Sequence, residues 1–285
     1  MTWRLALRLG RVSNLPTVWT NVMAAAVLAG VPVASLDVLA LAVACSLFYV
    51  GGMFLNDAFD REFDARVRPE RPIPSGATSA ATVFACGFGL LGAGLLAVVG
   101  VAGVTGPAVT AALALAGTIV TYDAWHKNNP YAPILMGVCR VLVYVTTAAA
   151  LTGGVPVAVV AGSVVLLSYL IGLTYVARQE NLTEVAHLWP VMLLALPFLW
   201  RLPTAWVGGS SSLLYLGFLG WVVLGVSHLG WRERLDVPRA VVSLIAGIAL
   251  LDGLLIAGAG KTTLIPVAVL GFVLTLWLQR SISGT

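Results

Sequence analysis

Residues 36–64 read LDVLALAVACSLFYVGGMFLNDAFDREFD, an apolar run that ends in a group of acidic side chains. The apolar part, 36–56, has about the ~20 residues that a helix needs to cross the hydrocarbon core of a membrane. The acidic part begins at Asn56 and continues to Asp64. The stretch therefore predicts a membrane-spanning helix that carries a polar site at one end.

The rest of the chain is equally apolar. Hydrophobic residues make up 59% of the 285 residues and charged residues only 10%, against about 25% charged residues in soluble domains. Ten stretches are long and apolar enough to be spans: 15–33, 36–56, 78–100, 106–124, 132–152, 155–177, 188–206, 211–230, 238–258 and 262–279. Pro190, Pro197 and Arg201 interrupt the stretch 188–206, so the pattern allows nine or ten spans.

No stretch shows the alternation of a strand, and a helical bundle then satisfies every backbone group in lipid. We therefore predict one all-α, multi-pass transmembrane helical bundle over residues 1–285. In the candidate span 78–100, Ala85, Gly89 and Ala93 recur every four residues and predict a close helix–helix seam. Composition gives no indication of a nucleic-acid partner; the bilayer is the expected surroundings.

Basic residues orient the bundle. With the amino terminus inside, 13 of the 16 Lys and Arg residues fall on one side, Arg201 and Lys261 fall on the other, and Arg140 lies within a span. This asymmetry predicts that the amino terminus and the acidic loops face the cytoplasm from the cell membrane. Arg4, Arg8 and Arg11 share one helical face before the first span, which predicts a short helix on the membrane surface.

The acidic residues are spaced for metal binding. Asn56, Asp60 and Asp64 are four residues apart and share one helical face, and Asp57 lies one position off it. The pair Glu180 and Glu184 repeats this spacing after the sixth span. Magnesium binds carboxylates together with water and substrate phosphate. Basic residues that suit a diphosphate lie between the two acidic groups: Arg66, Arg68, Arg71, Lys127 and Arg178. Considered without the second acidic pair, the acidic loop after the second span has an alternative interpretation, a solvated connector between two membrane helices.

The motif Asn56-Asp57-x-x-Asp60-x-x-x-Asp64, followed by Arg71-Pro72-Ile73-Pro74-Ser75-Gly76, resembles the first signature of the UbiA superfamily of intramembrane prenyltransferases. Tyr122 with Lys127 resembles that superfamily's tyrosine–lysine element, and Glu180 with Glu184 stands where its second acidic motif lies. The resemblance implies nine helices around a central cavity that binds Mg²⁺ and an isoprenyl diphosphate.

Carried over by resemblance, the expected metal ligands are Asn56, Asp57, Asp60, Asp64, Glu180 and Glu184. The expected substrate-binding residues are Arg11, Asn14, Arg68, Arg71, Tyr122, Lys127, Arg140 and Arg178, and the expected catalytic residues are Asp60, Asp64 and Lys127. Two features depart from the family pattern. The second motif carries glutamates where aspartates are usual, and Asp123 and His126 interrupt the Tyr122 element. The stretch Tyr175–Glu180 is similar to an Ebo-type actinobacterial branch.

Three ionisable residues have two interpretations each. Arg140 lies inside the fifth span, where a charged group either lines a functional cavity or forms a structural pair. Asp252 lies deep in the ninth candidate span, and a helix–helix hydrogen bond is at least as good an explanation as a functional role. His126 is close to the predicted site, and a site role and an interfacial role are equally open.

The resemblance implies Mg²⁺-dependent transfer of an isoprenyl group from an allylic isoprenyl diphosphate to an acceptor, either aromatic or lipid-like, within the membrane. The alternative is a non-catalytic carrier that binds an isoprenoid diphosphate or a lipid-like cargo at the same site. A third class, the phosphatidyltransferases, also uses spaced aspartates. Its motif begins Asp-Gly-x-x-Ala-Arg, which this chain lacks.

Overall fold

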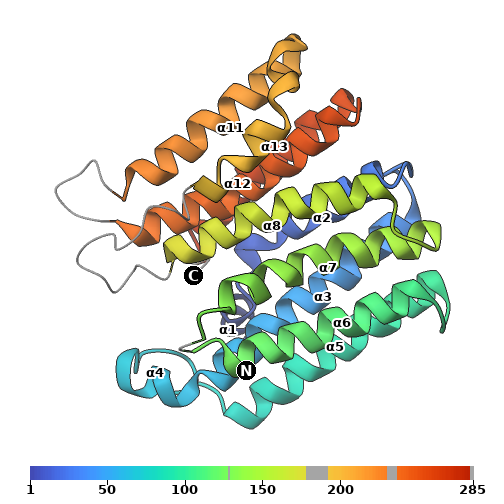
Figure 1. Ribbon diagram of the computed structural model, residues 1–285. Coiled ribbons are helices and arrows are strands. Elements are labelled where there is room, and N and C mark those ends of the chain that lie inside the picture. Colours follow the sequence, from blue (N-terminus) through green and yellow to red (C-terminus); the bar gives the residue numbers. More distant parts are fainter. Residues whose placement is uncertain (128, 178–191, 230–235, 283–285) are drawn as a thin grey trace.

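The computed structural model describes residues 1–127, 129–177, 192–229 and 236–282. Over these ranges the chain forms helices and connecting turns, and no strand (Figure 1). The elements are α1 (Trp3–Leu9), η1 (Val12–Asn14), α2 (Leu15–Leu28), α3 (Leu36–Phe59), α4 (Arg61–Val67), α5 (Ala80–Ala102), α6 (Pro107–Trp125), α7 (Ala132–Thr152), α8 (Val157–Ala177), α10 (Leu196–Trp200), η3 (Leu202–Trp206), α11 (Gly209–Ser227), α12 (Val237–Gly258), η4 (Thr262–Leu264) and α13 (Ile265–Gln279).

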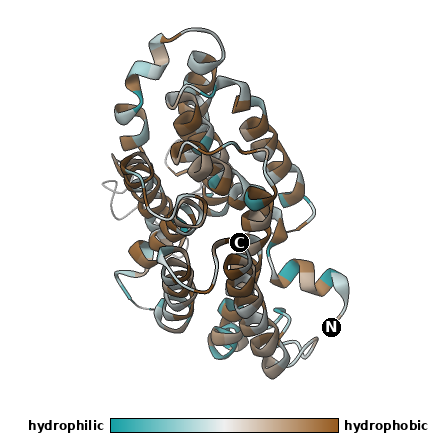
Figure 2. Ribbon diagram, turned by 90° about the vertical axis from the view of Figure 1, so that its right-hand side faces the viewer, coloured by the Kyte–Doolittle hydropathy of each residue, from teal (hydrophilic) through white to brown (hydrophobic). Residues whose placement is uncertain are grey.

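Eight of the described helices are long and apolar enough to cross a membrane. They are α3, α5, α6, α7, α8, α11, α12 and the stretch Thr262–Gln279 that contains α13. Apolar residues cover most of their length (Figure 2). The prediction of an all-α, multi-pass membrane bundle is confirmed. The side of the membrane that each end faces stays a prediction, and so does the single-domain organisation.

The first predicted span is shorter than expected. α2 ends at Leu28 after 14 residues, about 21 Å of helix, and the chain turns at Gly30, whose φ is +77°. The candidate span 188–206 differs more, because its described part is not one continuous helix but the short elements α10 and η3. Proline at residues 197 and 203 removes backbone donors from a regular helix.

The interrupted segment still packs along the bundle. The Tyr215 hydroxyl of α11 donates to the Phe198 carbonyl of α10 at 3.1 Å. Further on, the Arg201 guanidinium lies against Gly258 at the carboxyl end of α12, where a Cβ atom would collide with it. The segment therefore follows the neighbouring spans without being a regular helix over its described part.

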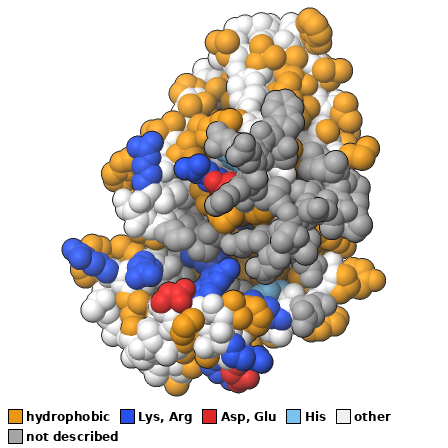
Figure 3. Space-filling view, turned by 90° about the vertical axis from the view of Figure 1, so that its left-hand side faces the viewer, with side chains coloured by type: hydrophobic (Ala, Val, Ile, Leu, Met, Phe, Trp, Pro, Cys, Tyr) orange, Lys and Arg blue, Asp and Glu red, His pale blue; other side chains and the backbone are white. Residues whose placement is uncertain are grey.

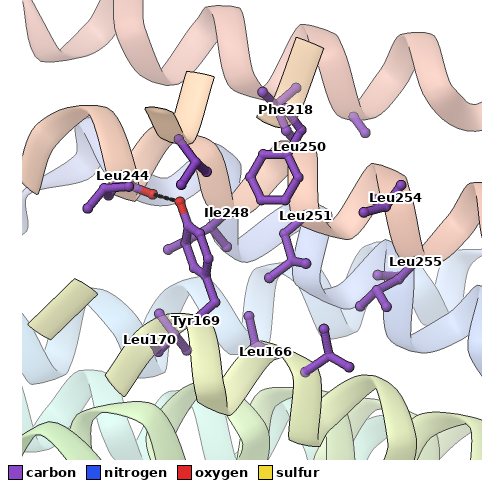
Figure 4. Packing of buried hydrophobic residues seen from close by; sticks show 14 of the residues in the cluster. Leu166, Tyr169, Leu170, Phe218, Leu244, Ile248, Leu250, Leu251, Leu254 and Leu255 are labelled. Carbon is purple, nitrogen blue, oxygen red and sulfur yellow. Dashed lines mark hydrogen bonds between the residues drawn. The ribbon is translucent and has the colours of Figure 1, made fainter. Parts of the chain in front are cut away.

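Two large apolar cores and a small cluster around Leu9 and Phe54 hold the described part of the bundle together, and α2 contributes to both large cores. The first core joins α8, α11 and α12 around Tyr169, Phe218 and Leu251; there the Tyr169 hydroxyl donates to the Leu244 carbonyl at 2.8 Å (Figure 4). The second joins α3, α5 and α6 and includes Phe48. Both α2 and α7 contribute residues to the two cores and so join the two groups of helices.

α3 and α5 pack unusually closely. A Cβ atom on Gly51 would lie 2.9 Å from the Gly87 carbonyl oxygen, and one on Gly94 would lie 3.1 Å from the Ala44 carbonyl oxygen. The predicted seam of Ala85, Gly89 and Ala93 is wrong: these residues are exposed, and Gly89 has no atom within 4 Å of its Cβ position. Small residues recur on both faces of α5, and the face that bears Gly87 and Gly94 is the one turned to α3.

The amino-terminal helix is also shorter than predicted. α1 begins after its cap Thr2 and ends at Leu9. Arg11 lies beyond it with φ of +42°, the left-handed region. Arg11 therefore does not share a helical face with Arg4 and Arg8, as the spacing predicted. It turns toward the end of α3, which we call the motif end of the bundle.

Candidate diphosphate and metal site

The acidic run forms one continuous helical stretch at the motif end. α3 ends at Phe59 and α4 begins at Arg61, but the hydrogen-bond ladder continues, since the Asp60 amide donates to the Asn56 carbonyl at 3.0 Å and the Asp64 amide to the Asp60 carbonyl at 2.8 Å. All four predicted polar ligands of this run are buried: Asn56, Asp57, Asp60 and Asp64. The structure thus brings them together, as their spacing predicted.

Two arginines from opposite sides hold these carboxylates. Arg11 Nη2 lies 3.3 Å from Asp57 Oδ1 and 3.4 Å from Asn56 Oδ1. Arg71 Nη1 lies 3.0 Å from the same Asp57 oxygen and 3.2 Å from Asp64 Oδ2. The turn after α4 positions Arg71, whose amide donates to the Arg68 carbonyl at 3.0 Å. Both arginine side chains are largely buried, so their guanidinium groups are aimed into the acidic run rather than at solvent.

The end of α6 contributes a second group of polar residues. Lys127 Nζ lies 3.0 Å from Asp60 Oδ2 and 4.2 Å from the centre of the Phe63 ring. His126 Nε2 lies 3.4 Å from the same Asp60 oxygen, and its ring stacks on Tyr122 with centroids 5.0 Å apart. The predicted Tyr122 and Lys127 are therefore both at the site, and His126, whose role the sequence left open, contacts it directly.

Asp123 is a site residue that the sequence reasoning missed. Its side chain is 3% exposed, and Asp123 Oδ1 accepts a hydrogen bond from Asn56 Nδ2 at 3.1 Å. Asp123 Oδ2 is buried and has no hydrogen-bond partner among the described residues. The sequence feature that could have identified Asp123 is its spacing of four residues from Lys127, which is the spacing of side chains on one face of a helix.

The surroundings of Asp60 and Asp64, which lie outside the spans, shift the pKa values of these two carboxyl groups in opposite directions. Burial opposes ionisation of Asp60, but hydrogen bonds and charge from His126 and then Lys127 outweigh it and hold the pKa of Asp60 below its usual value. Burial raises the pKa of Asp64, with Arg71 opposing and the negative charges of Asp60 and Asp57 adding to the rise. Asp60 is thus the carboxylate best kept anionic.

The remaining predicted residues fall in three places. Asn14, at the start of α2, donates to the Tyr49 hydroxyl at 3.2 Å and accepts from Gln279 of α13 at 2.9 Å. Arg68 is half-buried at the end of α4. Arg140 lies deeper in the bundle and does not join the acidic run. Arg178, Glu180 and Glu184 lie outside the described residues.

The face of the molecule at the motif end gathers both signs of charge amid apolar side chains (Figure 3). Its acidic run offers carboxylate and amide oxygens, the ligands that Mg²⁺ prefers, and the unpartnered Asp123 oxygen lies beside them. Among the described residues no three His, Cys, Asp or Glu side chains converge on one point. The described part of the site fits a metal that keeps water and substrate phosphate among its ligands.

Comparison with known proteins identifies related sequences. Residues 15–284 match the model of the UbiA prenyltransferase family. A digeranylgeranylglyceryl phosphate synthase of Metallosphaera sedula is 43% identical over 51 residues, 18% of either chain. A protein of the same name from Methanopyrus kandleri is 39% identical over 100 residues, 34% of this chain and 36% of that one. The matched stretches therefore span well under two thirds of either relative.

Solved structures share the fold over nearly the whole chain. A structure concerned with digeranylgeranylglyceryl phosphate synthase in membranes aligns with a TM-score of 0.55 and 18% identity, over 97% of this chain and 94% of that one. A UbiA homologue from Aeropyrum pernix K1 aligns with a TM-score of 0.51 and 14% identity, over 93% and 94% of the two chains. At such identities the likeness concerns the fold alone.

Proposed function

This chain belongs to the UbiA prenyltransferase family, and we propose that it transfers an isoprenyl group from an allylic isoprenyl diphosphate to a lipid-like or aromatic acceptor in the membrane, with Mg²⁺ as cofactor. The observation that carries the proposal is the environment of Asp60. This buried carboxylate lies where α3, α4 and the end of α6 meet, at one end of the apolar bundle. Lys127 and His126 contact it. The lipid-like acceptor is suggested by the names of the two curated relatives.

Donor binding uses the charges that already face one another at the motif end. Arg11, Arg71 and Lys127 lie 3.0–3.3 Å from carboxylate oxygens, so a modest change of side-chain torsions lets them donate to diphosphate oxygens instead. Asn56, Asp57, Asp60 and Asp64 would hold Mg²⁺, with Glu180 and Glu184 as the partner motif. When bound, the metal withdraws charge from the departing diphosphate.

The reaction breaks the bond between C1 of the isoprenyl group and the bridging diphosphate oxygen, and the electron pair leaves with the diphosphate. A bond then forms between C1 and the acceptor, which loses a proton. The basic residues neutralise the growing charge on the diphosphate, and the apolar residues of the bundle keep water from the allylic cation. Fixing donor and acceptor side by side supplies the remaining part of the rate enhancement.

The test is diphosphate release by purified protein supplied with Mg²⁺, an allylic isoprenyl diphosphate and a panel of lipid and aromatic acceptors. Asp60→Ala and Asp64→Ala should lower release by on the order of 10²-fold or more. Glu62→Ala is the matched control, because Glu62 lies in α4 beside Asp64 but its carboxylate is exposed and pairs with the neighbouring Arg61. Wild-type rates in both aspartate variants would contradict the proposed site.

A further inference from the structure

The short helix α1 lies against the outside of the bundle. Figure 2 views the spans nearly end-on and shows α1, beside the N label, from its side, so α1 runs across the direction of the spans. Leu9 on its inner face is 1% exposed and packs in a small cluster with Phe54 of α3 and Val83 of α5. Because Phe54 is near the end of α3 and Val83 near the start of α5, α1 is held close to the motif end of these two spans.

The outer face of α1 carries two arginines that have no acidic partner. Arg4 and Arg8 are four residues apart, so they share one face, and both are exposed. Among the described residues no ion pair involves either of them, and α1 itself contains no acidic residue. Trp3 is 69% exposed, and its ring lies 5.5 Å from the Arg4 guanidinium carbon. Exposed tryptophan and arginine on one short helix are typical of a helix at the membrane surface.

A hollow of about 340 Å³ lies beside these arginines. Arg4 and Arg8 form its basic side, and the rest of its lining comes from the start of α1 and the loop before α5: Met1, Thr2, Leu5 and Ala77. Guanidinium groups donate several N–H bonds in the geometry that phosphate oxygens accept. The hollow therefore suits a phosphate group that arrives from outside the protein.

A second hollow, also of about 340 Å³, adjoins the first, because Met1 lines both. Its other lining residues are apolar or small and belong to two spans: Phe54 of α3 and Cys86, Gly89 and Leu90 of α5. Gly89 lies nine residues after Ala80, where α5 begins, which is about 14 Å of helix. No atom lies within 4 Å of the Cβ position of Gly89, so the protein leaves this space open. The second hollow thus follows α5 from the motif end into the apolar part of the bundle.

We propose that the two hollows together bind one anionic phospholipid of the surrounding bilayer. Arg4 and Arg8 bind the headgroup phosphate, and one acyl chain lies along Phe54 and Gly89. The positive face of α1 favours an anionic headgroup over a zwitterionic one, because α1 offers no carboxylate to a positive headgroup. An acyl chain is the expected occupant of the second hollow, because the hollow lies along two spans. No lining residue belongs to the acidic run or contacts it, so the proposal is independent of the proposed reaction.

The experiment measures the Kd of the first lipid bound by the detergent-solubilised full chain, by native mass spectrometry. The probes are dioleoylphosphatidylglycerol, which is anionic, and dioleoylphosphatidylcholine, which is zwitterionic and has the same acyl chains. Glycerophosphoglycerol, the anionic headgroup without acyl chains, is added as a competitor. It distinguishes a phospholipid site from a site for a free phosphate ester.

Two variants each remove one half of the site. Arg4→Gln/Arg8→Gln removes the charges of the first hollow, and its control is Arg239→Gln/Arg280→Gln, which removes two exposed arginines that line neither hollow. Gly89→Leu fills the second hollow without meeting a protein atom. Its control is Gly117→Leu on α6, where again nothing lies within 4 Å of the Cβ position. All these positions are exposed, so the variants should fold, and thermal unfolding checks this.

Wild type and both controls should bind the phosphatidylglycerol about 30-fold more tightly than the phosphatidylcholine, as two arginines near a lipid surface predict. Arg4→Gln/Arg8→Gln should lose this preference. Gly89→Leu should weaken the binding of both phospholipids about fivefold or more, because the acyl chain loses its buried contacts. Equal affinity of wild type for the two phospholipids, or a wild-type preference in the arginine variant, would overturn the proposal. Unchanged binding in Gly89→Leu, or displacement of the lipid by glycerophosphoglycerol, would overturn it as well.

Discussion

Asp60 and Asp123 face the same space from different helices, and their surroundings differ. Asp60 is contacted by Lys127 and His126, whereas one oxygen of Asp123 has no partner among the described residues. The spacing Asn56, Asp60, Asp64 was sufficient to predict the first residue. The spacing within the acidic run could not identify Asp123, because its contact with Asn56 depends on how α6 packs against α3.

Asp123→Asn tests whether this carboxylate supports metal binding. Asp123 accepts from Asn56 Nδ2 and so directs the Asn56 amide oxygen toward the acidic run. An asparagine removes a negative charge and weakens that orientation, so the affinity for Mg²⁺ with isoprenyl thiodiphosphate should fall about tenfold. Calorimetric titration measures it, with Asp236→Asn at the start of α12 as control. Equal affinities in both variants would leave Asp123 with a packing role only.

At the scale of elements, the boundaries of most apolar spans could be predicted to within a few residues, but the faces by which the helices pack could not. Small residues occur on two faces of α5, so the sequence allowed the seam at Gly89 as readily as the real one at Gly87. The interruption of the stretch 188–206 could be predicted, because the effect of proline on a helix is local. The second acidic motif, Glu180 and Glu184, lies outside the described residues.

The close contact of α3 with α5 gives a stability prediction. Gly51→Leu places a side chain where the Gly87 carbonyl lies 2.9 Å from the Cβ position, so it should lower stability by about 1–3 kcal/mol and displace the acidic run at the end of α3. Gly89→Leu is the control, because nothing lies within 4 Å of its Cβ position. Thermal unfolding in detergent compares the two, and equal midpoints would show that α3 and α5 do not pack as described.

At the scale of the whole molecule, α2 joins two apolar cores and carries polar residues toward two different places. Asn14 at its start donates to the Tyr49 hydroxyl of α3, and Asn21 in its middle contacts both Arg140 and Asp252. The described part of the bundle therefore has a charged site at its motif end and, in its interior, the Arg140 guanidinium and the Asp252 carboxylate on either side of Asn21. Arg140 and Asp252 are far apart in the sequence. Hydropathy could therefore place each of them within a span, but it could not show that Asn21 brings them together.

The most direct test of the account is mass analysis of products formed by purified wild-type protein with Mg²⁺, an allylic isoprenyl diphosphate and a panel of lipid and aromatic acceptors. We predict an acceptor whose mass has increased by one isoprenyl group, formed together with inorganic diphosphate and absent without Mg²⁺. Saturable binding of the isoprenyl diphosphate with no new product and no released diphosphate, across the whole acceptor panel, would contradict the account and identify the chain as a carrier.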